Sequence, residues 1–295
     1  KRKQNRLPDL LTTRAKMRAI TGCHPTESVP VRCITVDSPD GLFLVTKSFI
    51  PTHNSSLAKQ LAVYAAQHGK RVLYFSREMS DLKIFYRMLA PLTDIPVSHI
   101  RYGLDLGRIE RSLDAMKQLA ELGIFFDTHT TDIEDVRTKT REMIRLEGID
   151  LTIGDYANQF SAAKVRKSAN RSDVVAAVWR GWKDIDQEFE IGSLLLAHPT
   201  SDYQKQQPSK KPDERQAPYF DQTHESREAG KAVDVGIVLW TELGKGQPGA
   251  RPATLYIDYQ RDEEAGGKIP LVFDGRIMEF HEPRDERAPE LAGWD

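Results

Sequence analysis

Cysteine is scarce in this sequence: Cys23 and Cys33 are the only two, and none follows residue 33. A disulfide-stabilised secreted protein is therefore not expected, and the usage fits a reducing cytoplasm. The sequence also lacks an apolar run long enough to span a membrane, and no apolar segment follows the basic residues 1–6. Neither a membrane partner nor a secretory signal is expected. The histidines are too scattered to predict a metal cluster.

An excess of charge of either sign is lacking as well. The chain has 42 Lys and Arg against 43 Asp and Glu, a net charge of −1. Such a balance does not by itself indicate a nucleic-acid-binding protein, so that function would depend on local basic segments. The sequence does not begin with Met, and we interpret it as part of a longer protein or as one half of a split gene. Its 295 residues allow one sizeable domain and an appendage.

The most informative segment is residues 50–56, which separate a strand-like apolar run from a helix-like amphipathic one. The side-chain amide of Asn54 can attack its own backbone carbonyl, form a succinimide and break the chain after itself. His53 can polarise that carbonyl or protonate the leaving amine. Ser55 can accept an acyl group on its hydroxyl and pass it to its own nitrogen. The alternative is a chance tripeptide in which Asn54 or Ser55 caps a helix.

The residues before this junction predict a β-hairpin over 31–45, with a Ser-Pro-Asp-Gly turn between two strands. Together with the junction, this hairpin resembles the C-terminal end of an intein of the kind found in phage genes. Cys33 stands where many inteins carry an Asp near the active centre, although a buried apolar thiol is an equal alternative. Gly41 stands where many such hairpins have a His. The resemblance implies a small all-β, Hint-type fragment, with a complementary intein N-fragment and its N-extein as partner.

From Ser55 onward, helix-like segments alternate with short apolar strands, the third of which is interrupted by Thr152 and Gly154. This alternation predicts an α/β domain with a mostly parallel sheet flanked by helices. The expected helices are 56–68, 81–92, 107–121, 131–147 and 173–189. The expected strands are 72–75, 124–127, 151–156, 193–198, 233–239 and 253–258, with a closing hairpin formed by 269–273 and 277–280.

Two further motifs stand in order along this domain: Phe-Ser-Arg-Glu-Met-Ser at 75–80 and a Ser-Arg-Glu-Ala-Gly segment followed by Ala-Val-Asp-Val within 226–235. They resemble the RecA-like ATPase domain of DnaB-family replicative helicases. In that family the first helix follows a phosphate loop, Gly-x-x-x-x-Gly-Lys-Ser/Thr, whose last position here would be Ser55. None of the Gly-Lys pairs at 69, 230, 244 and 267 is followed by Ser or Thr. The loop and its strand are therefore expected on sequence absent from this chain.

The resemblance assigns roles to polar residues near the ends of the expected strands. Glu78 would orient or deprotonate the attacking water, and Asp155 would be the Walker B residue that holds Mg²⁺ together with Ser55. Ser55 and Ser56 would lie at the nucleotide. His198 takes the place of a Gln that senses the γ-phosphate. The alternatives are that Glu78 is an ordinary surface residue, that Asp155 only ends a strand, and that His198 is buried for structural reasons.

Arg261 resembles the arginine finger of a Lys-x-Arg motif, which would reach the nucleotide of a neighbouring subunit and stabilise charge in the transition state. Tyr259 replaces the Lys of that motif and is expected at the nucleotide as well. The resemblance thereby implies a homo-hexamer. The alternative is a surface hairpin Arg paired with Asp262 or Glu263, which would contribute little.

Two polar stretches, 161–171 and 202–215, would form loops that line a central pore and contact DNA phosphates. The alternative is ordinary solvated loops. The residues expected to bind single-stranded DNA are Lys164, Arg166, Lys167, Arg171, Lys205, Lys210, Lys211 and Arg215.

The sequence therefore predicts three parts: an intein segment at 1–54, a RecA-like motor without its phosphate-loop strand at 55–283, and a tail at 284–295. After splicing, we expect a hexameric helicase that uses ATP and Mg²⁺ and moves along single-stranded DNA. A primase and a helicase loader are further possible partners, and the setting is the host cytoplasm if a phage encodes the protein. The unspliced chain is expected to lack ATPase activity. The alternatives are a RecA-like recombinase or ATPase without unwinding, and a non-splicing nucleotide-binding or interaction module.

Overall fold

The computed structural model describes residues 54–102, 106–165, 170–198, 217, 219–222, 227–241 and 249–287. All of them belong to one compact unit that spans Leu44–Asp295. The expected intein segment before Asn54, including His53, Cys33 and the hairpin, lies outside the described residues. No helix among these described ranges is long and apolar enough to cross a membrane.

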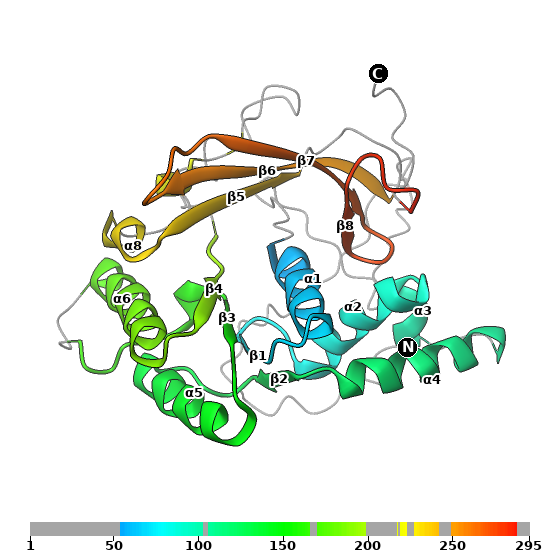
Figure 1. Cartoon of the computed structure of the whole chain (residues 1–295), viewed down its shortest axis with the longest axis horizontal. Helices are drawn as coiled ribbons and strands as arrows, with labels where there is room; N and C mark the ends of the chain where they lie inside the picture. Colours follow the sequence, from blue (N-terminus) through cyan, green and yellow to red (C-terminus); the bar gives the residue numbers. More distant parts are fainter. Residues whose placement is uncertain are drawn as a thin grey trace, which may run out of the picture. The chain divides into compact units, whose positions relative to one another are not determined.

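The first part of the described chain alternates helices and strands as the sequence predicts (Figure 1). Its strands are β1 (Val72–Ser76), β2 (Ile124–Asp127), β3 (Leu151–Asp155) and β4 (Gly192–Leu195). Its helices are α1 (Asn54–Gln67), α2 (Asp81–Thr93), α3 (Val97–Tyr102), α4 (Leu106–Glu121), α5 (Ile133–Glu147) and α6 (Arg171–Phe189), with a 3₁₀ turn η2 (Ala157–Gln159). Only α3 has no counterpart among the expected elements.

The four strands form a parallel sheet in the order β2-β1-β3-β4. The register pairs Phe75 with Gly154 and Gly154 with Leu195. Gly154, which interrupts the apolar run of this strand, makes room for α6: a Cβ there would lie 2.7 Å from the Trp182 ring. The other interruption, Thr152, is buried and its hydroxyl accepts a hydrogen bond of 3.3 Å from Trp182 Nε1.

Helices cover both faces of this parallel sheet, as βαβ connections require. Ala58 and Ala62 of α1 pack with Tyr74, Ile153 and Leu196 on one face. On the other face, side chains of α5 and α6 pack against the sheet; this second cluster includes Leu73, Phe75, Val136, Val178 and Trp182. The sheet is therefore buried on both sides, and its functional groups are confined to strand ends and edges.

Capping side chains fix the ends of several helices. Asp132 accepts a hydrogen bond from the Glu134 backbone at the start of α5, and Asn170 and Asp173 form a reciprocal capping box at the start of α6. Ser80 occupies the N-cap position of α2, and its side chain makes no capping hydrogen bond.

The later strands do not join the parallel sheet. They form a separate antiparallel sheet in the order β5-β6-β7-β8. Its strands are β5 (Val235–Thr241), β6 (Ala250–Gln260), β7 (Gly267–Asp274) and β8 (Glu279–His281), preceded by η4 (Phe220–Gln222) and α8 (Arg227–Ala232). The closing hairpin is present as β7 and β8.

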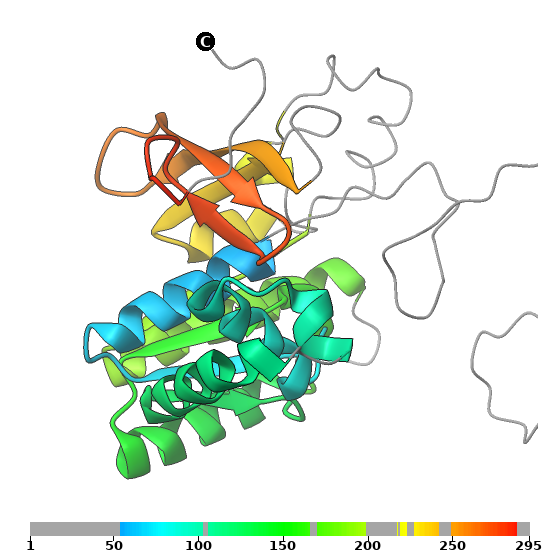
Figure 2. The same cartoon turned by 90° about the vertical axis from the view of Figure 1, so that its right-hand side faces the viewer.

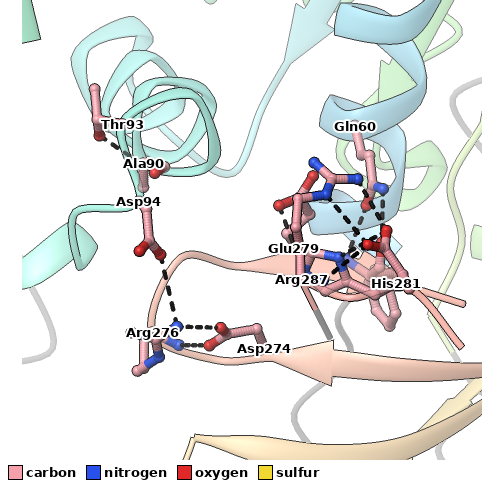
Figure 3. A network of polar contacts seen from close by, with 11 residues as sticks. Gln60, Ala90, Thr93, Asp94, Asp274, Arg276, Glu279, His281 and Arg287 are labelled. Atoms are coloured by element: carbon pink, nitrogen blue, oxygen red, sulfur yellow. Dashed lines mark hydrogen bonds and ion pairs between the residues drawn. The ribbon is translucent and has the colours of Figure 1, made fainter. Parts of the chain in front are cut away.

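The antiparallel sheet lies next to α1 (Figure 2), and polar contacts attach it to α1 and to the end of α2 (Figure 3). Gln60 Nε2 donates to the Phe280 carbonyl at 2.8 Å, and the Phe280 N–H donates to Gln60 Oε1 at 2.9 Å. Arg276 donates to the buried Asp274 carboxylate at 2.7 Å and lies 3.6 Å from Asp94, the residue that ends α2. These contacts hold one end of the second sheet against the helices.

Candidate functional site

Parallel strands bring the predicted polar residues to one edge of the sheet. Glu78 follows β1, Asp155 ends β3 and His198 follows β4, so all three lie at the carboxyl ends of neighbouring strands. This edge is where ligands bind in open α/β sheets. Ser55, in the first turn of α1, lies at the same edge, because its hydroxyl reaches Asp155.

Asp155 is fully buried and receives two hydroxyl hydrogen bonds. Ser55 Oγ donates to Oδ1 at 3.0 Å, and the Tyr74 hydroxyl donates to Oδ2 at 2.8 Å. Burial raises the pKa of the Asp155 carboxyl, and the two hydroxyl groups oppose that rise. Burial and the adjacent carboxylate together raise the pKa of Tyr74. The carboxylate is thus held rigidly with both oxygens in use.

A buried lysine adjoins this carboxylate. Lys59 is one turn after Ser55 on α1, is 2% exposed, and its Nζ has no hydrogen-bond partner among the described residues. Burial and then the Arg87 guanidinium lower the pKa of Lys59 to about 7, while Asp155 and Glu78 oppose the shift. Burial also lowers the pKa of Arg87. The side chains of Lys59 and Arg87 therefore lie near the carboxyl groups of Asp155 and Glu78 in a poorly solvated site.

Tyr74, Lys59 and Arg87 were not among the site residues predicted from the sequence. Tyr74 resembles an ordinary core residue of a strand, and Lys59 resembles a solvated residue of a surface helix. The available signal was spacing: residues four apart on a helix share a face, so Lys59 had to lie on the same side of α1 as Ser55.

Glu78 and His198 face each other across the site. His198 Nε2 lies 3.8 Å from Glu78 Oε2, and the His198 ring packs edge-on against Tyr156 with centroids 4.0 Å apart. The interaction with His198 lowers the pKa of Glu78, against the effect of burial. Since Glu78 is half exposed, the pair contributes little to stability. It positions a carboxylate that is open to solvent.

Asn54 begins α1 and bridges to β4. Its Nδ2 donates to the Ala197 carbonyl at 3.0 Å, and its Oδ1 accepts from the Ser55 N–H at 3.0 Å. The second contact resembles a local helix cap, which agrees with the alternative reading of this junction. His53, its expected partner in catalysis, lies outside the described residues.

Of the remaining nucleotide residues, Ser56 is buried in the first turn of α1. Arg261 follows β6, and its guanidinium contacts residues just before β5. Nη2 donates to the Lys231 carbonyl at 2.8 Å, and Nη1 lies 3.0 Å from Asp234 Oδ1. The alternative for Arg261 was an ion pair with Asp262 or Glu263; the structure shows an ion pair, but with Asp234. Tyr259 stacks on Phe220, with ring centroids 6.3 Å apart.

Few of the predicted DNA-binding residues fall in described parts of the chain. Lys164 is exposed and pairs with Glu134 at 2.8 Å, and Arg171 is the first residue of α6. The others lie outside the described residues: Arg166, Lys167, Lys205, Lys210, Lys211 and Arg215.

The site offers hard oxygen ligands rather than a metal cluster. Across the described ranges, no group of three or more His, Cys, Asp or Glu could hold a metal ion. A hydroxyl and a carboxylate 3.0 Å apart, as in Ser55 and Asp155, are the ligand types that Mg²⁺ takes when phosphate oxygens and water complete its shell. The residues present therefore fit a Mg²⁺ ion that arrives with a phosphorylated ligand.

Family models and curated proteins show what this chain is similar to. Residues 52–282 match the model of the DnaB-like helicase C terminal domain. The replicative DNA helicase DnaB of Mycobacterium intracellulare is 26% identical over 269 residues, covering 88% of this chain and 42% of that protein. The DnaB of Mycobacterium leprae is 26% identical over 273 residues, with coverages of 89% and 41%. The chain thus spans about two fifths of the length of these curated relatives.

Solved structures share the fold. A solved ATPase domain superposes with a TM-score of 0.68 at 16% identity, covering 77% of this chain and 80% of that one. A DnaB-like replicative helicase, studied with its primase interactions, gives a TM-score of 0.67 at 17% identity, with coverages of 77% and 54%. The expected α/β fold with a parallel sheet is confirmed. From Thr52 to Glu282, the chain belongs to the family of the DnaB-like helicase C terminal domain.

Proposed function

We propose that this chain is the C-terminal part of a replicative DNA helicase interrupted by an intein, and that splicing at Ser55 joins it to a segment carrying the phosphate loop. The observation that carries the proposal is the 3.0 Å hydrogen bond from Ser55 to Asp155. The residue that would accept the acyl group in splicing is also the residue whose hydroxyl lies on the candidate magnesium carboxylate. Joining the two segments at Ser55 would complete a phosphate loop beside that carboxylate.

The splicing chemistry depends on three consecutive residues. The Ser55 hydroxyl attacks the ester or thioester that joins the upstream segment to the first residue of the intein N-fragment, so a new ester forms at Ser55 and that residue's side chain leaves with the proton. Asn54 Nδ2 then attacks the Asn54 carbonyl carbon, which closes a succinimide and releases the Ser55 amine, with His53 as the proton donor. The free amine takes the acyl group from the hydroxyl, and a peptide bond replaces the ester.

The Asn54 contacts impose an order on these events. Because Asn54 Nδ2 is bound to the Ala197 carbonyl at 3.0 Å, it is unable to attack its own backbone carbonyl while that contact persists. Splicing would therefore precede the docking of the start of α1 onto β4, or require its release.

The spliced product would hydrolyse ATP at the strand-end site. Glu78 would orient the attacking water, and its lowered pKa keeps it ionised for that role. Ser55 and Asp155 would hold Mg²⁺, which supplies charge neutralisation at the phosphates. Ser56 would contact the phosphates, and His198 would connect that site to β4.

Further partners follow from the family. Arg261 and Tyr259 would lie near the nucleotide of a neighbouring subunit in a homo-hexamer, which requires Arg261 to exchange its intramolecular partners for that nucleotide. The basic loops near Lys164 and at 202–215 would contact single-stranded DNA. A primase and a helicase loader would bind the ring, in the cytoplasm of a bacterial host infected by a phage that encodes it.

The relatives support an origin of both parts in one helicase gene. The match to the Mycobacterium intracellulare protein covers 88% of this chain, which is more than residues 52–295 contain. Some of the segment before Thr52 is therefore also similar to that helicase.

Intact mass spectrometry tests the proposal. The chain is mixed with intein N-fragments whose N-extein ends in a helicase phosphate loop, and a ligated product containing Ser55–Asp295 is expected. Asn54→Ala should abolish the product, while Asn158→Ala, a matched change outside the junction, should not. Ligation that survives Asn54→Ala, or no ligation with any of several matched N-fragments, would contradict it.

A further inference from the structure

The hydrogen bond between Ser55 and Asp155 exists before any splicing. The chain still carries Asn54 joined to Ser55, and in it Ser55 Oγ donates to Asp155 Oδ1 at 3.0 Å. Asp155 ends β3, a hundred residues after Ser55, and lies outside the predicted intein segment 1–54. The hydroxyl that would accept the acyl group is therefore already in contact with a carboxylate of the domain that follows the junction.

The geometry of this contact suits proton transfer. A general base lies within about 2.6–3.2 Å of the oxygen whose proton it takes, and the 3.0 Å from Ser55 Oγ to Asp155 Oδ1 falls in that range. The other oxygen, Oδ2, accepts a hydrogen bond from the Tyr74 hydroxyl at 2.8 Å. Tyr74 thereby holds the carboxylate in place and leaves Oδ1 to Ser55.

Burial protects the same contact from water. Asp155 is fully buried, and Ser55 is 7% exposed. An ester formed on Ser55 would be shielded from hydrolysis at this place. The upstream segment must nevertheless reach it, because splicing leaves its acyl carbon bonded to the Ser55 nitrogen. The acyl donor and the carboxylate would therefore meet at the start of α1.

The contacts of Asn54 separate the two steps of splicing. Ester formation needs the Ser55 hydroxyl, whereas chain cleavage needs Asn54 Nδ2, which is bound to the Ala197 carbonyl at 3.0 Å. Asn54 Oδ1 is occupied as well, since it accepts a hydrogen bond from the Ser55 N–H at 3.0 Å. The folded junction therefore leaves the hydroxyl on its carboxylate and holds back the cleavage that would follow.

We propose that Asp155 is the general base for acyl transfer to Ser55, so that a residue of the helicase domain catalyses the ligation of that domain. This role rests on the splicing function proposed above. As Ser55 Oγ bonds to the acyl carbon, its proton passes to Asp155 Oδ1. The bond from that carbon to the side-chain oxygen or sulfur of the first N-fragment residue breaks, and this side chain takes the proton from Asp155. The carboxylate is restored, and the acyl group is an ester on Ser55.

This role makes splicing depend on folding. β3 brings Asp155 to the junction only when it pairs with β1 and β4 in the parallel sheet. A precursor whose downstream domain has not folded would lack the base and would transfer the acyl group slowly. Ligation would thus be confined to chains in which that domain is folded.

The test follows ester formation alone. In an Asn54→Ala chain the succinimide is unable to close, so the branched ester accumulates after mixing with an intein N-fragment and its N-extein. Intact mass gives the rate of formation, and hydroxylamine identifies the ester. Adding Asp155→Asn is expected to slow this step by about 10²-fold or more. Asp274→Asn is the matched control: it removes another buried carboxylate, bonded to Arg276 in the antiparallel sheet, and should leave the rate unchanged.

A change of nucleophile separates catalysis from structural support. A thiol, with a pKa of about 8.5, needs a base far less than a hydroxyl does. In the Ser55→Cys chain, Asp155→Asn is therefore expected to slow the transfer by less than about tenfold, because little base catalysis is lost. The comparison holds even if Asp155→Asn loosens the fold, since a loss of structure would slow the serine and cysteine chains alike.

Three outcomes would overturn the role of Asp155. Equal rates of ester formation with and without Asp155→Asn would exclude it and leave the splicing function standing. Equal slowing of the serine and cysteine chains would assign Asp155 to structural support, again without touching the splicing function. No ester from the parent junction with any of several matched N-fragments would overturn the splicing function, and this role with it.

Discussion

The Ser55 hydroxyl donates a hydrogen bond of 3.0 Å to Asp155, joining the start of α1 to the end of β3 across a hundred residues of sequence. The acceptor is a fully buried carboxylate that also binds Tyr74. The contact therefore links the predicted splice junction to the predicted magnesium site. Its contribution to stability and its role in ATP hydrolysis can both be measured.

Ser55→Ala removes a hydrogen bond to a buried carboxylate and is expected to lower the free energy of unfolding by about 1–2 kcal/mol. Urea denaturation of the full chain measures this change. A double-mutant cycle with Asp155→Asn isolates the pair and should give a coupling energy of about 1 kcal/mol. Effects that add within about 0.3 kcal/mol would mean that the hydroxyl and the carboxylate do not interact.

Lys59 gives a pH dependence of stability. Its pKa is lowered to about 7 in the folded chain from an ordinary value of 10.5. Between these values the unfolded chain holds the proton and the folded chain does not, so stability rises with pH, by at most about 1.4 kcal/mol per pH unit from this group. Urea denaturation at pH 7, 8 and 9 should show this rise in the parent chain and a smaller one in Lys59→Met. Parallel profiles for the two chains would contradict the assignment.

Gly154 is required by packing against α6. A Cβ at this position would lie 2.6 Å from Leu195 Cδ1 and 2.7 Å from Trp182. Gly154→Ala is therefore expected to lower the melting temperature, through a destabilisation of about 1–3 kcal/mol. Gly192→Ala is the matched control, because its nearest contact would be an ordinary 3.6 Å. Equal melting temperatures for both variants would show that the helix tolerates the added methyl group.

Glu78→Gln tests the water-orienting role in the spliced product. Loss of a positioned general base is expected to reduce kcat for ATP hydrolysis by about 10²–10³-fold with little change in KM. Glu282→Gln, at an exposed carboxylate after β8, should leave kcat unchanged. A rise in KM at constant kcat would assign Glu78 to nucleotide binding instead.

The alternation of helices with apolar strands predicted the parallel sheet because each element carries its own periodicity and its own stop signals. Gly69 and Gly148, for example, end α1 and α5 with positive φ angles of 78° and 69°. The separation into two sheets was not predictable from local patterns, because strand order is set by backbone pairing between strands that are distant in the sequence. For β4 that partner is not among the described strands.

The rule that ligands bind at the carboxyl ends of parallel strands predicted that Glu78, Asp155 and His198 would lie at one edge, and they do. Their catalytic roles stay predictions. Lys59 and Tyr74 were missed because a lysine on a helix and a tyrosine in a strand each have an ordinary explanation. Only the fold brings both against one buried carboxylate.

The most direct test of the account is ATP hydrolysis followed through the splicing reaction, with the ligated mass measured in the same samples. The account predicts no ATPase activity from the unspliced chain, since it contains no Gly-Lys followed by Ser or Thr. Activity should appear in proportion to the ligated product and disappear with Asn54→Ala. ATP hydrolysis by the purified unspliced chain, or a ligated product that contains the phosphate loop but does not hydrolyse ATP, would contradict it.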